Sequence, residues 1–262
     1  MEDWNLFSTA LLFFAGLTAG IINTMAGGGS SVTIPALILL GIPGAEANAT
    51  NRLSVFFQSV SGVAVYAKKK IIDRKSFLRT FWPTLVGGAV GALAASFISN
   101  EIFEPLIFVV MIVFAFYLVA KKKPKKGNFF LEENSGTENS VTVSRYVESA
   151  LLFSAGFYGG FLQTGVGIYL LFVLHGAMKL DLNKANALKM ALVIPFTVVA
   201  LAIFIYLDLI WWTPGLIVAF GSALGARFTA KHTEYFSKVV IKWVTFGIVV
   251  SMSVVYIARN FL

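Results

Sequence analysis

Two basic residues, Arg52 and Lys189, lie inside long apolar stretches of the sequence. Pro43 suits the first turn of one helix and Asp181 the N-cap of another. Each cation is therefore expected roughly 12 Å along its helix, well inside a membrane. A cation there costs about 2.5–3.5 kcal/mol and marks a substrate path or a paired site. The alternative is that each side chain reaches back to the nearer surface. Because the carboxylates lie at the ends of the apolar segments and not in their interiors, the sequence favours a bound anion as the counter-ion.

A glycine-rich run, Gly27-Gly28-Gly29-Ser30-Ser31, separates a long apolar segment from one that is too short to cross a bilayer. A helix that begins after such a run presents unpaired N–H groups and the positive end of its dipole, which favours an anion. The alternative is a tight turn in which glycine only permits close packing. A second run, Gln163-Thr164-Gly165-Val166-Gly167, predicts another broken helix.

The tips of these two broken helices would surround one anion with hydrogen-bond donors. The backbone candidates are Gly28, Gly29, Ser30, Gly165 and Gly167. The side-chain candidates are Asn23, Thr24, Ser31, Gln163 and Thr164. The alternative is that these small polar side chains bond one another across a helix contact, as they often do in membranes.

The elements that carry these residues are those of a helical membrane protein. The 262 residues are 57% hydrophobic and only 13% charged, whereas soluble domains carry about 25% charged residues. The apolar runs are helix-length, which excludes the short alternating strands of an outer-membrane barrel. The net charge of +8 lies in clusters between the apolar runs, which is typical of orientation signals and not of nucleic-acid binding.

Metal, thiol and cofactor chemistry is not predicted. The sequence has no cysteine, and His175 and His232 are isolated from other ligand types. The first residues, Met1–Trp4, lack the basic region of a secretory signal, so the first apolar run is expected to remain in the mature protein.

The chain divides into an N-terminal transmembrane repeat (1–120), a polar cytoplasmic linker (121–148) and a C-terminal transmembrane repeat (149–262). The apolar segments cover approximately residues 6–25, 32–41, 48–67, 77–98 and 102–120, then 149–163, 167–178, 184–206, 210–228 and 239–259. Each repeat would hold a broken, re-entrant helix pair and three spanning helices.

The two repeats are similar in sequence and are predicted to insert in opposite directions. Residues 47–52 resemble residues 185–190, and the spacing of Gly87 and Gly91 recurs at Gly221 and Gly225. The basic clusters 68–70 and 121–126 are expected in the cytoplasm, with the N-terminus outside. The pattern predicts an all-α polytopic membrane protein built from two inverted repeats, as in many secondary transporters.

The sequence resembles the sulfite exporter TauE/SafE family over nearly its whole length, the linker excepted. The residues that carry the resemblance are Ala15-Gly16, Asn23-Thr24-Met25-Ala26-Gly27-Gly28-Gly29, Pro35 and Thr50-Asn51-Arg52-Leu53, then Gly156-Phe157-Tyr158-Gly159-Gly160-Phe161 and Ala187-Leu188-Lys189. The chain departs from the usual pattern at Gln163–Gly167, where a Gly-Pro-Gly-Thr-Gly-like run is common. It also has Asn23 where many relatives have an acidic residue.

The resemblance implies a carrier in the bacterial inner membrane that exports sulfite or an organosulfonate, and it adds Asn51 to the candidate site. The expected partners are that small anion and the lipid bilayer, with a homodimer as an open option and no nucleic acid. An anion channel and a non-transporting membrane scaffold are the alternatives. An intramembrane enzyme is disfavoured, because the apolar segments offer no nucleophile with a base, paired carboxylates or metal ligands.

Overall fold

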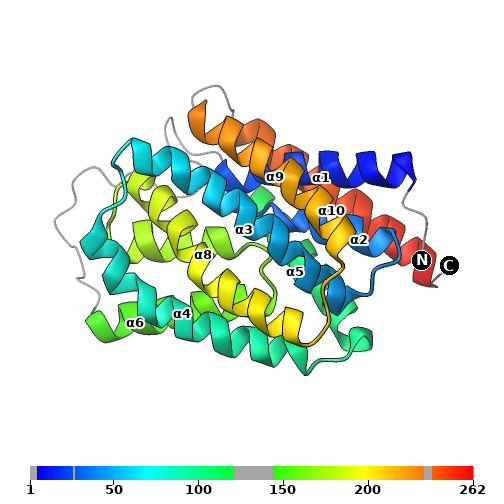
Figure 1. Ribbon diagram of the computed structural model, residues 1–262, viewed down its shortest axis with the longest axis horizontal. Helices are drawn as coiled ribbons and strands as arrows, with labels where there is room; N and C mark the ends of the chain where they lie inside the picture. The colour runs from blue at the N-terminus through cyan, green and yellow to red at the C-terminus, as the bar shows by residue number, and fades with distance from the viewer. Residues whose placement is uncertain (1–4, 26, 121–143, 233–237, 262) are drawn as a thin grey trace.

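The computed structural model describes residues 5–25, 27–120, 144–232 and 238–261, and every regular element in these ranges is helical (Figure 1). The helices are α1 (Leu6–Met25), α2 (Ser30–Leu39), α3 (Gly44–Lys68), α4 (Arg74–Ser96), α5 (Asn100–Ala120), α6 (Arg145–Phe161), α7 (Val166–Leu171), the π-helical turn η1 (Phe172–Ala177), α8 (Leu182–Tyr206), α9 (Trp212–Lys231) and α10 (Lys238–Phe261). Most of the predicted linker (121–143) and the first four residues lie outside the described ranges.

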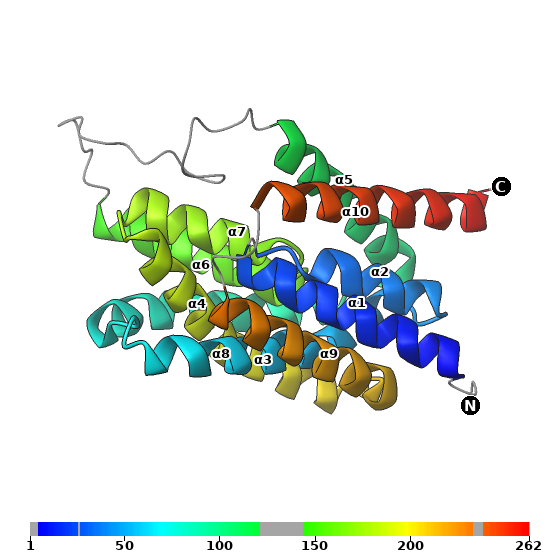
Figure 2. The same cartoon turned by 90° about the horizontal axis from the view of Figure 1, so that it is seen from above.

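The first broken helix consists of α1 and α2. Gly27 has a φ of 88°, a backbone conformation that glycine adopts at little cost. The chain reverses there, and α2 begins at Ser30. The end of α2 therefore returns to the end of the molecule where α1 starts (Figure 2).

The second broken helix consists of α6, α7 and η1. Gly165 is the N-cap of α7 with a φ of 77°, so glycine again permits the reversal. The run Gln163–Gly167 predicts this break but not the π-helical turn that follows it. The expected apolar segment starts at 149, later than Arg145 where α6 begins, because the polar residues 145–148 resemble the linker.

Two long helices, α3 and α8, run antiparallel through the middle of the molecule (Figures 1 and 2). Asp181 caps α8, since its carboxylate accepts hydrogen bonds from the backbone N–H groups of Asn183 and Lys184. The N-terminus of α3 is held by α5, where Glu104 accepts a bond from the Gly44 N–H at 2.9 Å. These capped starts fix the depth at which each helix carries its buried cation.

Glycines let the remaining helices cross at close range. A Cβ on Gly16 of α1 would lie 2.3 Å from the carbonyl oxygen of Val218 in α9. A Cβ on Gly156 of α6 would lie 2.2 Å from the carbonyl oxygen of Thr84 in α4. The broken helix of each half thus packs on a long helix of the other half, with the small-residue contact that is typical of membrane helix pairs.

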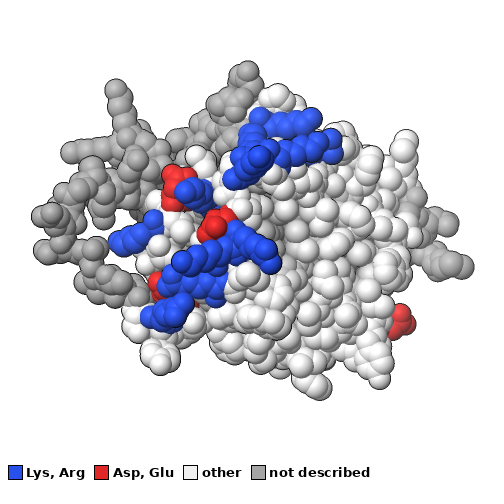
Figure 3. All heavy atoms as spheres, turned by 60° about the vertical axis from the view of Figure 1, so that its left-hand side comes forward, with Lys and Arg blue, Asp and Glu red and all other residues white. Residues whose placement is uncertain are grey.

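Surface charge is strongly unequal between the two ends of the molecule. Apart from Arg52 and Lys189, the Lys and Arg side chains whose exposure the structure describes lie at the end where α3 ends and α4 begins (Figure 3). Asp73 caps α4 at this end, and a hydrogen bond from the Ser76 hydroxyl lowers the pKa of its carboxyl. Glu101, Glu104 and Asp208 lie at the other end.

We expect Glu148→Gln to have a small effect, although Arg79 of α4 and Glu148 of α6 form an ion pair between the two halves. The Glu148 side chain is only 10% exposed, but that of Arg79 is 43% exposed, so solvent at the arginine screens the pair toward the contribution of about 0–1 kcal/mol that exposed pairs make. The unfolding temperature in detergent should fall by about 4 °C or less. A fall of more than about 10 °C would mean that the pair holds the halves together.

By length and apolar composition, α1 and α8 are long and hydrophobic enough to cross a membrane. Other long helices, such as α3, carry buried polar side chains that lower their hydropathy. The buried polar residues of α3 therefore lie in the interior of the molecule and not on its lipid-facing surface.

Candidate functional site

The tips of the two broken helices meet inside the molecule. A Cβ on Gly27 would lie 2.5 Å from the carbonyl carbon of Gly167, and a Cβ on Gly167 would lie 2.5 Å from the Cα of Gly27. Both residues are buried. The structure therefore brings together the two glycine runs that the sequence analysis singled out, and only glycine fits at the contact.

Arg52 of α3 is fully buried and reaches the end of α6. Its guanidinium donates to the carbonyl oxygens of Gly159 and Gly160 and to Oε1 of Gln163. It also lies over the ring of Phe204, with 5.6 Å between the guanidinium carbon and the ring centroid. The last carbonyls of a helix have no partner within the helix, so Arg52 supplies the donors that the broken helix lacks.

Lys189 of α8 is 1% exposed and reaches the end of α1. Its Nζ donates to the carbonyl oxygen of Asn23 at 3.1 Å and to Oδ1 of Asn186 at 3.0 Å. An ammonium has three N–H donors, and these two bonds use two of them. The alternative of a side chain that reaches back to the surface is wrong for both cations, because both are buried.

The two cations occupy separate positions along the α3–α8 pair. Arg52 contacts Phe204, whereas Met190, next to Lys189, lies against Gly62. Ten residues separate Arg52 from Gly62 in the sequence, which is about 15 Å of helix. The contact between the tips is therefore flanked by one cation on each side, and the cations do not share a single set of partners.

The polar side chains of the first tip mostly bond one another. Asn51 donates to Oγ of Ser30 at 3.0 Å and accepts from the Thr33 hydroxyl at 2.5 Å. The hydroxyls of Thr24 and Ser31 donate to the carbonyl oxygens of Gly20 and Gly28. The hydroxyl protons of Thr24 and Ser31 are thus already used, while Gly28, Gly29 and Ser30 place the start of α2 beside the contact.

The second tip is strained and incompletely bonded. Gln163 has a φ of 60°, which non-glycine residues adopt only at a cost of about 1–3 kcal/mol and mostly at functional sites. The hydroxyl oxygen of Thr164 is buried and has no hydrogen-bond partner among the described residues. The same holds for Nε of Arg52. Both groups are unused hydrogen-bond donors on this side of the contact.

Sequence reasoning missed two asparagines that support the cations. Asn48 lies one turn before Arg52 and donates to the carbonyl oxygen of Phe161 at 3.0 Å. Asn186 lies one turn before Lys189 and accepts from it. The signal was present, because both asparagines fall within the repeated stretch that the sequence analysis aligned.

Lys189→Met is expected to leave stability nearly unchanged, because it removes a buried charge while keeping an unbranched side chain. The change removes the cost of burying the charge, and the two acceptors that it leaves, the Asn23 carbonyl and Oδ1 of Asn186, belong to half-buried residues, unlike the buried acceptors of Arg52. The unfolding temperature in detergent should stay within about 4 °C of the parent value. A much larger drop would show that the bond to Asn23 is what holds α1 in place.

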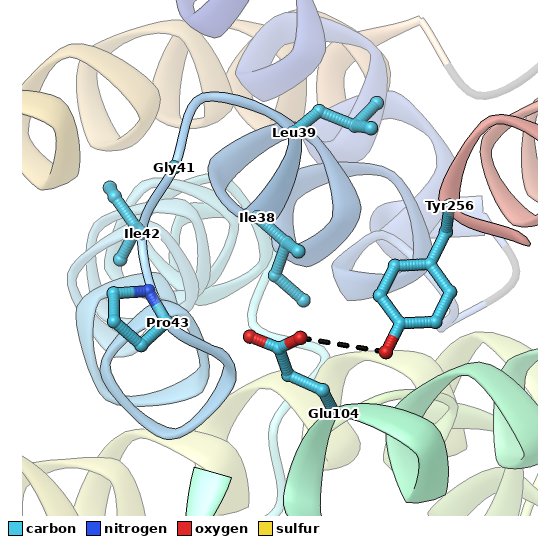
Figure 4. A pocket seen from close by; sticks show the side chains of 7 residues that line it. All are labelled: Ile38, Leu39, Gly41, Ile42, Pro43, Glu104 and Tyr256. Carbon is cyan, nitrogen blue, oxygen red and sulfur yellow. Dashed lines mark hydrogen bonds between the residues drawn. The ribbon is translucent and has the colours of Figure 1, made fainter. Parts of the chain in front are cut away.

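A cavity of about 250 Å³ opens at the end of the molecule opposite the basic cluster (Figure 4). Glu104 and Tyr256 point toward each other at its edge, and the Tyr256 hydroxyl donates to Oε2 of Glu104 at 3.5 Å. A carboxylate in the wall disfavours an anion. Glu104 instead caps α3, so this cavity is separate from the candidate anion site.

Comparisons with known proteins find one family model and several relatives of this chain. Residues 12–256 match the family model of the sulfite exporter TauE/SafE. A probable membrane transporter protein from a Sinorhizobium species, ORF9, is 28% identical over 92% of this chain and 89% of its own length. A probable membrane transporter protein from Haemophilus influenzae is 29% identical over 89% of this chain and 88% of its own length.

A further relative, the probable membrane transporter protein YfcA of Escherichia coli, is 27% identical over 84% of this chain and 79% of its own length. The match to the family model covers both broken helices, both buried cations and the contact between the tips. The resemblance noted in the sequence is thereby confirmed. The chain belongs to the sulfite exporter TauE/SafE family of membrane transporters.

Proposed function

We propose that the chain is a secondary transporter that exports a small sulfur oxyanion, sulfite or an organosulfonate, by alternating access. One observation carries the proposal: two fully buried cations flank the contact between two helix tips, and their described partners are carbonyl and amide oxygens, not carboxylates. Carbonyl dipoles offset only part of each charge. An anion between the tips would supply the missing negative charge.

The donors that would hold the anion follow from the bonding around each cation. Nε of Arg52 and one N–H of Lys189 are not used by the bonds described above. The N–H groups of Ser31 and Val32 in α2 and of Val166 in α7 already donate to the carbonyl oxygens of Gly28, Gly29 and Gln163, so these backbone groups are not counted among the donors for the ion. Thr164 adds a free hydroxyl. Because the two cations lie apart, the donors on each side would replace part of the hydration shell of an ion that reaches that side of the contact.

Alternating access is supported by the relation between the halves. The broken helix α1–α2 enters from the end that carries Glu104, and α6–α7–η1 enters from the basic end. This is the arrangement expected of an inverted repeat, with the substrate near the bilayer midplane. Rocking of one half against the other would open the site to each side in turn.

The orientation we propose puts the basic end and the linker in the cytoplasm of a bacterial inner membrane, with the N-terminus outside. Because the sequence has no cysteine, an introduced cysteine is the sole labelling site. A cysteine at Lys70 should react with an impermeant maleimide only in inverted membrane vesicles, and one at Asp208 only in intact spheroplasts. The opposite pattern would contradict this orientation.

The test of the function is anion binding followed by flux. Purified protein should bind sulfite or a sulfonate, measured by isothermal titration calorimetry, at least tenfold more tightly than chloride. Proteoliposomes should show saturable flux of the same anion. Single-channel currents in planar bilayers would indicate a channel instead. Absence of both binding and flux would favour a scaffold.

A further inference from the structure

The helices α3 and α8 contact each other along one stripe of residues on each. On α3, Val55 and Gly62 face α8, since Val55 belongs to one buried hydrophobic cluster with Val193 and Phe196, and Gly62 lies against Met190. On α8, residues 190, 193 and 204 face α3. Spacings of three and four keep residues on one helix face. The facing stripe of α3 therefore includes Ser59, and that of α8 includes Thr197.

Ser59 and Thr197 occupy equivalent positions in the two halves. The shift that aligns Ala47 with Ala185 also aligns Ser59 with Thr197. The two hydroxyl groups thus face the same crossing from opposite helices.

Both hydroxyls are buried and unpaired. Ser59 is 1% exposed and Thr197 is 0% exposed, and neither oxygen has a hydrogen-bond partner in the described ranges. The buried hydroxyls of Thr84 and Ser253, in contrast, donate to the carbonyl four residues earlier at 2.7 and 2.8 Å. A buried polar group without a partner is costly, so two at equivalent positions need an explanation.

The pair lies between the two cations. Ser59 is seven residues beyond Arg52 toward the basic end, or about 10 Å along α3. Thr197 is eight residues beyond Lys189 toward the other end, or about 12 Å along α8. An ion that passes from one cation to the other along the α3–α8 crossing would meet both hydroxyls.

We propose that Ser59 and Thr197 form a transit site that binds the oxyanion as it passes between Lys189 and Arg52. This inference rests on the proposed transport function. A sodium ion is disfavoured at this position because a buried cation lies on each side. Neutral hydroxyls suit a transit site, since conduction needs binding that is strong enough for entry and weak enough for release.

The test compares flux with equilibrium binding in full-length protein. The double variant Ser59→Ala/Thr197→Val removes both hydroxyls with little change in volume. Sulfite flux into proteoliposomes should fall by about tenfold or more, because each hydroxyl would donate to a charged ligand. Sulfite affinity by calorimetry should change by less than threefold, because the two cations are intact. The single variant Thr197→Ser keeps a hydroxyl at this position, so its flux should stay within about threefold of that of the parent protein.

The matched controls are Thr84→Val and Ser253→Ala, which remove buried hydroxyls that already have partners. Both should transport at the parent rate, and all variants should elute as one peak in size-exclusion chromatography. Parent-like flux in the double variant would overturn the transit site and leave the transport function standing. Sodium dependence that disappears in the double variant would also overturn it. Parent protein that neither binds nor transports sulfite would overturn both proposals.

Discussion

Arg52→Ala is expected to destabilise the protein severely and to abolish transport. The guanidinium holds the carbonyl oxygens of Gly159 and Gly160 at the end of α6, as well as the side chain of Gln163. Its loss would leave these buried acceptors unpaired, at a cost of about 3–5 kcal/mol. The unfolding temperature in detergent should fall by about 10 °C or more, and sulfite flux should be undetectable.

Two further variants separate the role of the charge from that of the geometry. Arg52→Lys keeps the charge but loses the planar fork that reaches several oxygens, so it should recover part of the stability and less than a tenth of the flux. Arg74→Ala removes a cation at the exposed start of α4 and should change neither property. Parent-like transport by Arg52→Ala would remove Arg52 from the proposed site.

Gly27→Ala is the second substitution with a large expected effect. The new methyl group would lie 2.5 Å from the carbonyl carbon of Gly167, where the obstacle is backbone that cannot move aside. The φ of 88° adds backbone strain for alanine. We expect the two tips to separate and the free energy of unfolding to fall by about 3 kcal/mol or more. Sulfite flux should be absent. Melting curves and proteoliposome assays measure the two effects.

Gly247→Ala in α10 is the matched control. A Cβ there would meet nothing within 4 Å, and alanine favours a helix over glycine by about 0.5–1 kcal/mol. The control should be as stable as the parent protein or slightly more so, with normal flux. If Gly27→Ala behaves in the same way, then the contact between the tips is not needed for folding or transport.

The main features of the fold could be predicted from local sequence signals. The glycine runs at 27–29 and 165–167 interrupt apolar segments, and the structure has breaks at both. Asp181 was expected to cap a helix and does so. The distance of Lys189 from the start of α8 followed from that cap alone. Such signals lie within a few residues of the feature that they determine, which is why one sequence suffices to read them.

The partners of the cations could not be predicted in this way. Arg52 is bound mainly by main-chain carbonyls more than a hundred residues away, and every residue has a carbonyl. No pattern of residue types marks which of them will accept. For the same reason, the hydroxyls of Thr24 and Ser31 were expected to donate to a ligand, whereas they bond to backbone within one turn.

The exchange of cations between the halves has a consequence for how the chain can be assembled. Arg52 completes a helix of the second half, and Lys189 completes a helix of the first. A half-chain inserted alone would leave its cation without a partner and the carbonyl oxygens at one helix end without donors. Association with the other half would satisfy both. Under the inverted-repeat arrangement that we propose, a single repeat produced alone would therefore be stable only as an antiparallel pair, with one copy in each orientation.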